Sequence, residues 1–112
     1  MSVRLIALAA ALVPTMALAD WKPLSGAEIT AALTDRTLVY EDGAKQEFHA
    51  DGGTVYVKDS PSRGHWAVRA EEYCSVWPPS DRWDSYGLEG EGEAMRFVAK
   101  DGSFTAGTYA AP

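Results

Sequence analysis

The single cysteine and the two histidines are the side chains of this sequence best suited to covalent chemistry. A thiolate and an imidazole within hydrogen-bond reach form the nucleophile and base of acyl-transfer enzymes, so Cys74 would act with His65 or His49. However, Cys74 lies within a predicted strand, with no helix N-terminus or nucleophile elbow beside it. A cysteine in that position typically behaves as a small buried hydrophobic residue. We therefore predict that the protein is not an enzyme.

A soft metal such as copper is the second possibility, because thiolate, imidazole and thioether groups favour such ions. The available groups belong to His49, His65, Cys74 and Met95. No two of them have a ligand spacing such as H-x-H or C-x-x-C, and scattered histidines are more typical of exposed or hydrogen-bonded positions. We predict no metal site and no cofactor.

Three glutamates alternate with glycines near the C-terminal end, in Glu89-Gly90-Glu91-Gly92-Glu93. An extended backbone would place Glu89, Glu91 and Glu93 on one side, where their oxygens could hold Ca²⁺ weakly. The glycines make such a site costly to order, so a solvated hairpin loop is the preferred interpretation. The same acidic loop could instead block a basic hydrolase of the cell envelope, which is our alternative hypothesis for the function.

The stretch 64–86 holds three of the four tryptophans and the cysteine. Residues 73–77 are rich in β-formers. Pro78-Pro79-Ser80-Asp81 cannot continue a central strand, because proline lacks an N–H donor and fixes φ. A returning strand from Arg82 onward completes a hairpin, since a four-residue loop is an ordinary hairpin connection.

A symmetric register in this hairpin places Cys74 opposite Ser85 and Trp77 opposite Arg82. Because side chains alternate between the two sides of a strand, one face carries Cys74, Val76, Trp83 and Ser85. The other, the aromatic face, carries Tyr73, Trp77 and Tyr86. We predict that one face is core, that Trp66 and Trp83 are core residues, and that the lone thiol is buried.

The aromatic face is predicted to be a half-covered surface, with the Arg82 guanidinium over Trp77. Exposed aromatic patches on soluble proteins often mark binding sites, and Tyr and Trp dominate interface energies. The candidate binding residues are therefore Tyr73, Trp77, Arg82 and Tyr86. The competing interpretation is that a helix or another strand covers this face.

One short helix and eight strands are expected around this hairpin. Ser25 and Glu28 have the spacing of a capping box, and a helix over 26–33 would place Ile29 and Leu33 on one face. Its apolar surface is too small for independent stability, so it should close an end or edge of the sheet. The strands are predicted at 37–41, 45–50, 54–58, 65–69, 73–77, 83–88, 94–99 and 104–109.

Short connections of this kind join antiparallel neighbours, because parallel crossovers need a dozen residues or more. The expected fold class is therefore mainly β: an antiparallel eight-stranded meander that forms a small barrel or a strongly curled sheet. Four Trp, five Tyr and three Phe side chains are expected to fill the interior. A solid core is thus favoured over a deep ligand cavity.

Residues 1–19 have the pattern of a secretory signal peptide: a positive residue, an apolar run and an Ala17-Leu18-Ala19 cleavage site. Pro14 interrupts the apolar run, which falls short of the about 18 residues of a membrane span. We predict cleavage before Asp20, one small β-domain over 20–112, and a periplasmic or secreted location.

The charge of the chain limits the partners. Ten Lys and Arg residues stand against sixteen Asp and Glu residues, a net charge of −6. Nucleic acids and anionic lipids require basic patches, so neither is expected as a partner. A single cysteine also rules out an internal disulfide.

The main hypothesis is a binding module for another envelope protein or for a small apolar ligand.

Three segments carry a resemblance to a known group. The pattern W-x-P-L-x-G-x-E-I-x-x-A-L, followed by G-x-W-x-V and Y-C-S-x-W-P-P-S-x-x-W-x-x-Y, resembles small exported proteins of unknown function from alphaproteobacteria. The resemblance spans residues 21–109 and is most specific over 73–83. It implies Gram-negative export, a small β-fold and no assigned activity. The group pattern has a second cysteine where this chain has Ser85, so the disulfide that the resemblance implies is absent here.

Overall fold

The computed structural model describes residues 20–111, and the predicted signal peptide, residues 1–19, lies outside them. The elements of the described chain follow one another in the order β1 (Lys22–Pro23), α2 (Gly26–Leu33), β2 (Arg36–Tyr40), β3 (Lys45–Phe48), β4 (Gly53–Val57), β5 (Pro61–Arg69), β6 (Glu72–Val76), β7 (Asp84–Glu91), β8 (Ala94–Val98) and β9 (Phe104–Tyr109). The predicted helix has the observed bounds, and all eight predicted strands are present with ends that differ by a few residues.

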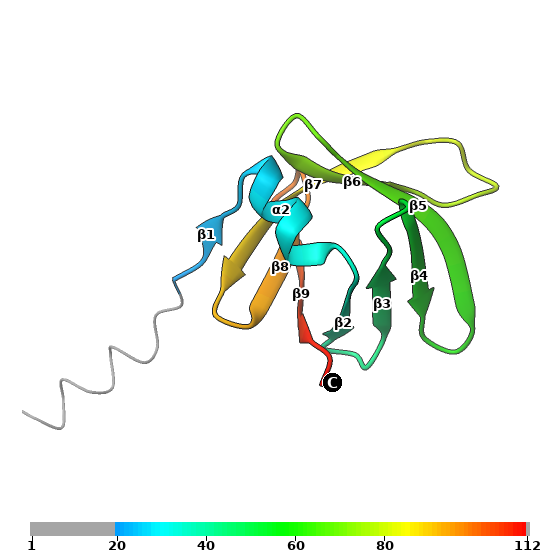
Figure 1. Ribbon diagram of the computed structural model, residues 1–112, viewed down its shortest axis with the longest axis horizontal. Coiled ribbons are helices and arrows are strands. Elements are labelled where there is room, and N and C mark those ends of the chain that lie inside the picture. The colour runs from blue at the N-terminus through cyan, green and yellow to red at the C-terminus, as the bar shows by residue number, and fades with distance from the viewer. Residues whose placement is uncertain (1–19, 112) are drawn as a thin grey trace, which may run out of the picture.

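Strands β2 to β9 form a closed antiparallel barrel (Figure 1). Each strand pairs with the next one along the chain, and β2 pairs with β9 to close the ring. The prediction of an eight-stranded antiparallel meander is confirmed. Strand β1 was not predicted. It pairs with Glu89 and Gly90 of β7, whereas β6 pairs with residues 84–86 of the same strand. The two exposed residues of β1 carry no strand pattern that a sequence analysis can detect.

Helix α2 closes one end of the barrel. The predicted capping box is present: the Ser25 side chain accepts a hydrogen bond from the Glu28 amide (3.2 Å), and the Glu28 carboxylate accepts one from the Ser25 amide (2.8 Å). Ile29 and Leu33 are fully buried among core residues. The helix start is also tied to the barrel, because the Gly26 amide donates to the Glu71 carboxylate (2.7 Å) between β5 and β6. Within residues 20–111, no helix has the length and apolar character needed to cross a membrane.

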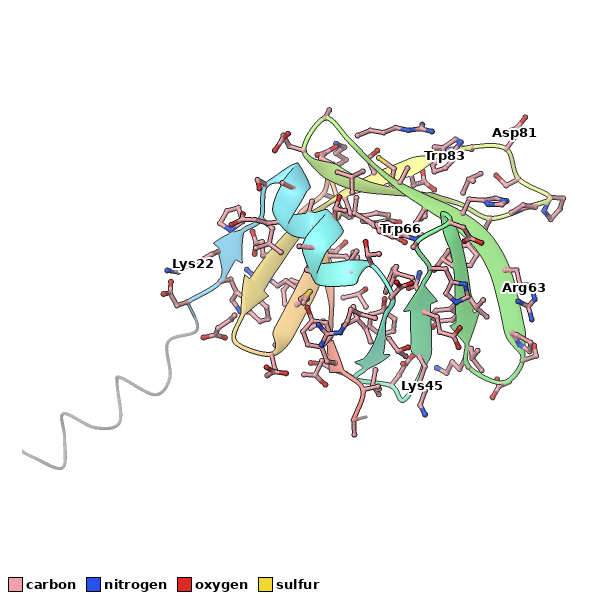
Figure 2. All side chains as sticks on the ribbon, viewed as in Figure 1. Lys22, Lys45, Arg63, Trp66, Asp81 and Trp83 are labelled. Carbon is pink, nitrogen blue, oxygen red and sulfur yellow. The ribbon has the colours of Figure 1, made fainter. Side chains whose placement is uncertain are left out.

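The apolar core lies beneath the helix, in that half of the barrel interior. Phe48 is at its centre: its ring is 5.8 Å from the ring of Trp66 and 5.9 Å from that of Tyr73, edge to face in both cases. Leu38 of β2 and Leu88 of β7 belong to the same core. Figure 2 shows Trp66 within this packed region, as predicted for a core residue.

The hairpin register is confirmed for its paired part. Tyr73 lies opposite Tyr86 and Cys74 opposite Ser85. The Cys74 thiol is 2.9 Å from the Ser85 hydroxyl and the residue is 3% exposed, so the lone thiol is buried as predicted. Strand β6 ends at Val76, however, and β7 begins only at Asp84.

The loop between these strands overturns two expectations. Arg82 is exposed and its guanidinium pairs with Asp84 (3.3 Å) instead of covering Trp77, because the loop leaves the ladder before these positions can face each other. Trp83 is half-buried rather than core, with the Arg69 guanidinium 4.1 Å from its ring centre. Figure 2 shows Trp83 and Asp81 on the loop that joins β6 to β7.

The predicted acidic loop is wrong. Glu89 and Glu91 belong to β7, which pairs with β8 through Glu91, and only the turn at 92–93 follows. The Glu89 carboxylate accepts a hydrogen bond from Arg96 Nε (2.7 Å), and Glu91 accepts one from the Asp20 amide (2.9 Å). Pairing with β8 on one side and β1 on the other outweighs the low strand propensity of Glu and Gly, since strand preferences depend strongly on context. Glu93 remains exposed in the turn.

The Cys74–Ser85 pair predicts a disulfide that would strengthen the barrel. Directly opposed residues have Cα atoms about 4.5–5.5 Å apart, within disulfide range. The Ser85→Cys variant should therefore form an intramolecular bridge on oxidation, and a closed loop of about a dozen residues suggests roughly 2–3 kcal/mol of added stability. Thiol titration and thermal unfolding, with Ser85→Ala as the control for the lost hydroxyl, measure both effects. Free thiols that persist in folded, oxidised Ser85→Cys protein would contradict this register.

Candidate functional site

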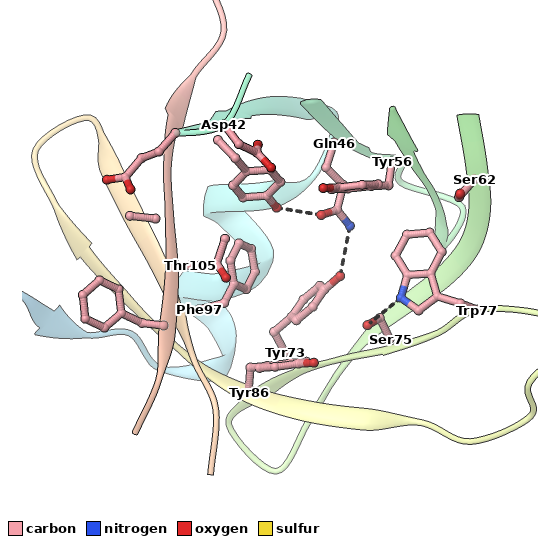
Figure 3. Close-up of a pocket in the computed structure, with 14 residues that line it drawn as sticks. Asp42, Gln46, Tyr56, Ser62, Tyr73, Ser75, Trp77, Tyr86, Phe97 and Thr105 are labelled. Atoms are coloured by element: carbon pink, nitrogen blue, oxygen red, sulfur yellow. Dashed lines mark hydrogen bonds between the residues drawn. The ribbon is translucent and has the colours of Figure 1, made fainter. Parts of the chain in front are cut away.

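A cavity of about 660 Å³ opens at the end of the barrel opposite α2 (Figure 3). Every strand of the barrel, or the residue directly after it, contributes to its lining. The lining residues are Tyr40, Glu41, Asp42, Gln46, Tyr56, Ser62, Tyr73, Ser75, Trp77, Tyr86, Phe97, Phe104, Thr105 and Ala106. The expectation that aromatic side chains fill the whole interior is therefore wrong. The volume lies in the range typical of small-molecule sites.

Small inward-facing residues explain why this half of the barrel stays open. Ser62, Ser75 and Thr105 occupy lining positions on β5, β6 and β9, whereas the half under α2 is filled by residues such as Phe48 and Leu88. The aromatic rings at the open end pack against one another and thus form walls. The rings of Tyr73 and Phe97, for example, are 4.9 Å apart at a steep angle. Such edge-to-face contacts stabilise neighbouring rings without filling the centre.

The predicted aromatic face is the wall of this cavity. Tyr73, Trp77 and Tyr86 do share one face of the hairpin, but that face points into the barrel and not to the outside (Figure 3). Tyr73 is 4% exposed, whereas Trp77 and Tyr86 are half-buried. The competing interpretation, that other strands cover the face, is close to what the fold shows. Arg82, the fourth predicted binding residue, does not line the cavity.

A buried polar network forms part of the lining at its inner end. The Tyr40 hydroxyl donates to the Gln46 carbonyl oxygen (2.6 Å), and the Gln46 amide nitrogen donates to the hydroxyls of Thr54 (2.9 Å) and Tyr73 (3.3 Å). Both amide hydrogens of Gln46 are thereby used. The network explains how a glutamine can be buried here at little cost, since buried polar groups are penalised mainly when unpaired. The sequence analysis missed Gln46, although a glutamine at an inward position of the strand over 45–50 was a usable signal.

The hydroxyls of this network are uncharged over a wide pH range. Burial raises the pKa of Tyr73 to about 12, and the neighbouring tyrosine Tyr86 adds to the rise. Burial raises the pKa of Tyr40 further still, with contributions from Tyr73 and Tyr56. Removing a phenol from water disfavours its ionised form. The inner end of the cavity is therefore polar and electrically neutral.

Trp77 is held against the wall by a close approach to β5. A Cβ atom on Gly64 would lie 2.5 Å from the Val76 carbonyl oxygen and 2.7 Å from the Trp77 ring, so only glycine fits there. The Trp77 indole N–H donates to the Ser75 hydroxyl (3.3 Å), and the ring meets Tyr56 edge to face. Position and orientation of this indole are thus fixed by strands β4, β5 and β6 together.

The other candidate groups of the sequence do not come together. The His49 ring pairs with Glu47 (2.9 Å), His65 is exposed on β5, and the Cys74 thiol contacts Ser85. Across residues 20–111, no three His, Cys, Asp or Glu side chains cluster closely enough to hold a metal ion. In the described structure, only the cavity gathers several candidate residues at one place.

Comparisons of this chain with known protein families, with curated proteins and with solved structures give no match. The resemblance to small exported proteins of alphaproteobacteria stays a prediction.

The raised pKa of Tyr73 predicts a loss of stability in alkali. The unfolded phenol ionises near its ordinary pKa of 10.0, while the folded one holds its proton up to about 12. The stabilising contribution is complete below the unfolded pKa and is lost as the pH rises through the folded one. The free energy of unfolding should thus fall with pH across this window, and less steeply in Tyr73→Phe. Urea titrations at several pH values measure the slope, and equal slopes would contradict the assignment.

Proposed function

We propose that this protein is an exported, non-enzymatic binding protein that holds one small, largely apolar molecule inside its barrel. The export part of the proposal is supported by the signal-peptide pattern of residues 1–19, which predicts a periplasmic or secreted location. The binding part is supported by one observation above all, the cavity of about 660 Å³ with its aromatic walls.

The architecture of the cavity favours a small molecule. An eight-stranded barrel is wide enough to hold one small ligand. Ligand sites in proteins are typically concave and lined by apolar and aromatic side chains, with a few polar groups that fix the orientation. Here the walls are mainly aromatic rings, while Ser75 and the Gln46 network supply the polar groups. A bound molecule would gain dispersion contacts that the empty volume forfeits.

The recessed position of the rings argues against the other partner of the main hypothesis, an envelope protein. Tyr73 and Ser75 are buried inside the barrel, where a flat protein surface cannot reach them. The alternative function, inhibition of an envelope hydrolase, depended on a free acidic loop. Because Glu89 and Glu91 are in a strand and already hydrogen-bonded, no feature of the described structure favours that alternative.

We propose a non-enzymatic function because the cavity lining has hydroxyl groups but no adjacent base to activate them. Activation of a hydroxyl nucleophile requires an adjacent base. The residues that line the cavity include neither histidine nor lysine, and within residues 20–111 neither Glu41 nor Asp42 is hydrogen-bonded to a hydroxyl of the lining. Binding without chemistry is the activity that these residues support.

Occlusion of the cavity tests the proposal. Nile red, a neutral dye whose fluorescence rises in apolar surroundings, should bind the parent protein. Thr105→Trp places a bulky ring inside the cavity, where Thr105 points in Figure 3, and should weaken dye binding at least about tenfold, the effect of losing about 1.4 kcal/mol.

Thr108→Trp is the matched control, because Thr108 is an exposed residue of the same strand that does not line the cavity. It should bind the dye as the parent does. Circular dichroism and thermal unfolding confirm that both variants are folded. Absence of dye binding to the parent, or equal binding to the two variants, would refute the proposal.

A further inference from the structure

The charges and rings of the cavity also indicate the chemical class of the ligand. We propose that the cavity binds an organic cation: an ammonium group carrying methyl or other alkyl substituents, joined to a further apolar part. This inference rests on the proposed function, because it specifies the ligand of the same cavity.

The ionisable groups of the lining have one sign. None of its residues is a lysine, arginine or histidine, and the two that are ionised at neutral pH are Glu41 and Asp42, both exposed. The Asp42 carboxylate is engaged by the Lys58 ammonium (2.9 Å) and by the Ala44 amide (2.9 Å). Glu41 has no ion pair within residues 20–111. An anionic ligand would lose its hydration here without gaining a positively charged partner from the lining, whereas a cation would be attracted to the Glu41 carboxylate.

The aromatic rings of the lining favour a cation independently of the carboxylates. The face of an aromatic ring is electron-rich and attracts cations, most strongly when the cation is removed from water. Rings from β2, β4, β6, β7 and β8 surround one space, and several meet at steep angles, such as Tyr56 and Trp77 at 80°. An ammonium group among them can contact more than one ring at once. Aromatic cages of this kind suit quaternary ammonium groups, which have no N–H to donate.

The same chain already uses this interaction elsewhere. The guanidinium of Arg36 lies 3.5 Å from the ring centre of Tyr109, and that of Arg69 lies 4.1 Å from Trp83. Among the described lining residues, only Phe104 has a cation over its ring, namely Arg96, whose charge is paired with Glu89. The inner rings have none. No basic side chain within residues 20–111 therefore competes with an incoming cation for these rings.

The polar groups and the volume refine the class. Gln46 uses both amide hydrogens, and Ser75 already accepts the Trp77 indole hydrogen, so the Gln46 amide has no hydrogen left to donate to an anionic group of a ligand. An alkylated ammonium needs no such partner. Because the cavity measures about 660 Å³, an alkylated ammonium head alone would leave most of it empty, which is why the ligand should carry an apolar part.

A pair of isosteres tests the inference. Benzyltrimethylammonium and neopentylbenzene have the same shape and differ in a positively charged nitrogen in place of a carbon. Each would be titrated against the parent protein loaded with Nile red. The cation should displace the dye at a concentration at least tenfold lower than the neutral compound.

Glu41→Gln should reduce this advantage several-fold, whereas Glu47→Gln, an exposed residue outside the cavity, should leave it unchanged. Equal potency of the two isosteres, a preference for the neutral one, or no displacement by the cation would overturn the inference. If the dye nevertheless binds the parent and is lost in Thr105→Trp, the proposed function stands and only the cation preference fails. If Glu41→Gln leaves the cation's advantage over the neutral isostere unchanged, the proposed contribution of the Glu41 carboxylate to cation binding is wrong.

Discussion

The pairing of β2 with β9 is the constraint on which the rest of this structure depends. It joins Leu38, Val39 and Tyr40 to the last strand and thereby closes eight strands into a ring of fixed width. An interior of that width must either be filled by side chains or enclose space. Closure is also tied to the helix, because the Tyr109 hydroxyl of β9 donates to the Ala32 carbonyl oxygen of α2 (2.9 Å). Strand β9 therefore both closes the ring and helps to hold α2 over one end of the barrel.

The two halves of the barrel interior have different roles: the half beneath α2 stabilises the fold, and the other half contains the proposed binding cavity. Beneath α2, fully buried residues such as Ile29, Leu33 and Phe48 form a close-packed core. Tyr73 joins the halves: its ring packs against Phe48, while its hydroxyl belongs to the polar network that lines the cavity. The packed half gives the wall rigidity without filling the cavity. A site built on rigid strands keeps its shape before a ligand arrives, which lowers the cost of binding.

Local signals predicted the framework well and the site poorly. The capping box at Ser25 and the Pro78-Pro79 turn are short-range features, so the helix and the Cys74–Ser85 register followed from the sequence. The direction of the aromatic face did not, because alternation separates two faces but cannot tell which is inside when both are apolar. Glu89 and Glu91 were misassigned because Glu and Gly have low strand propensity, which the local pairing with β8 and the long-range pairing of Glu89 with Pro23 of β1 outweigh. The open interior likewise depends on which side chains meet across the barrel, and no single stretch reveals that.

The account depends most on the claim that the ligand lies inside the barrel, against Trp77. A proton–nitrogen correlation spectrum shows one indole signal for each of Trp21, Trp66, Trp77 and Trp83, and of these four only Trp77 lines the cavity. Titration with benzyltrimethylammonium should shift the Trp77 signal most and leave those of Trp21 and Trp83 nearly unchanged. An unmoved Trp77 signal, or shifts confined to Trp21 or Trp83, would place any binding outside the barrel and contradict the account.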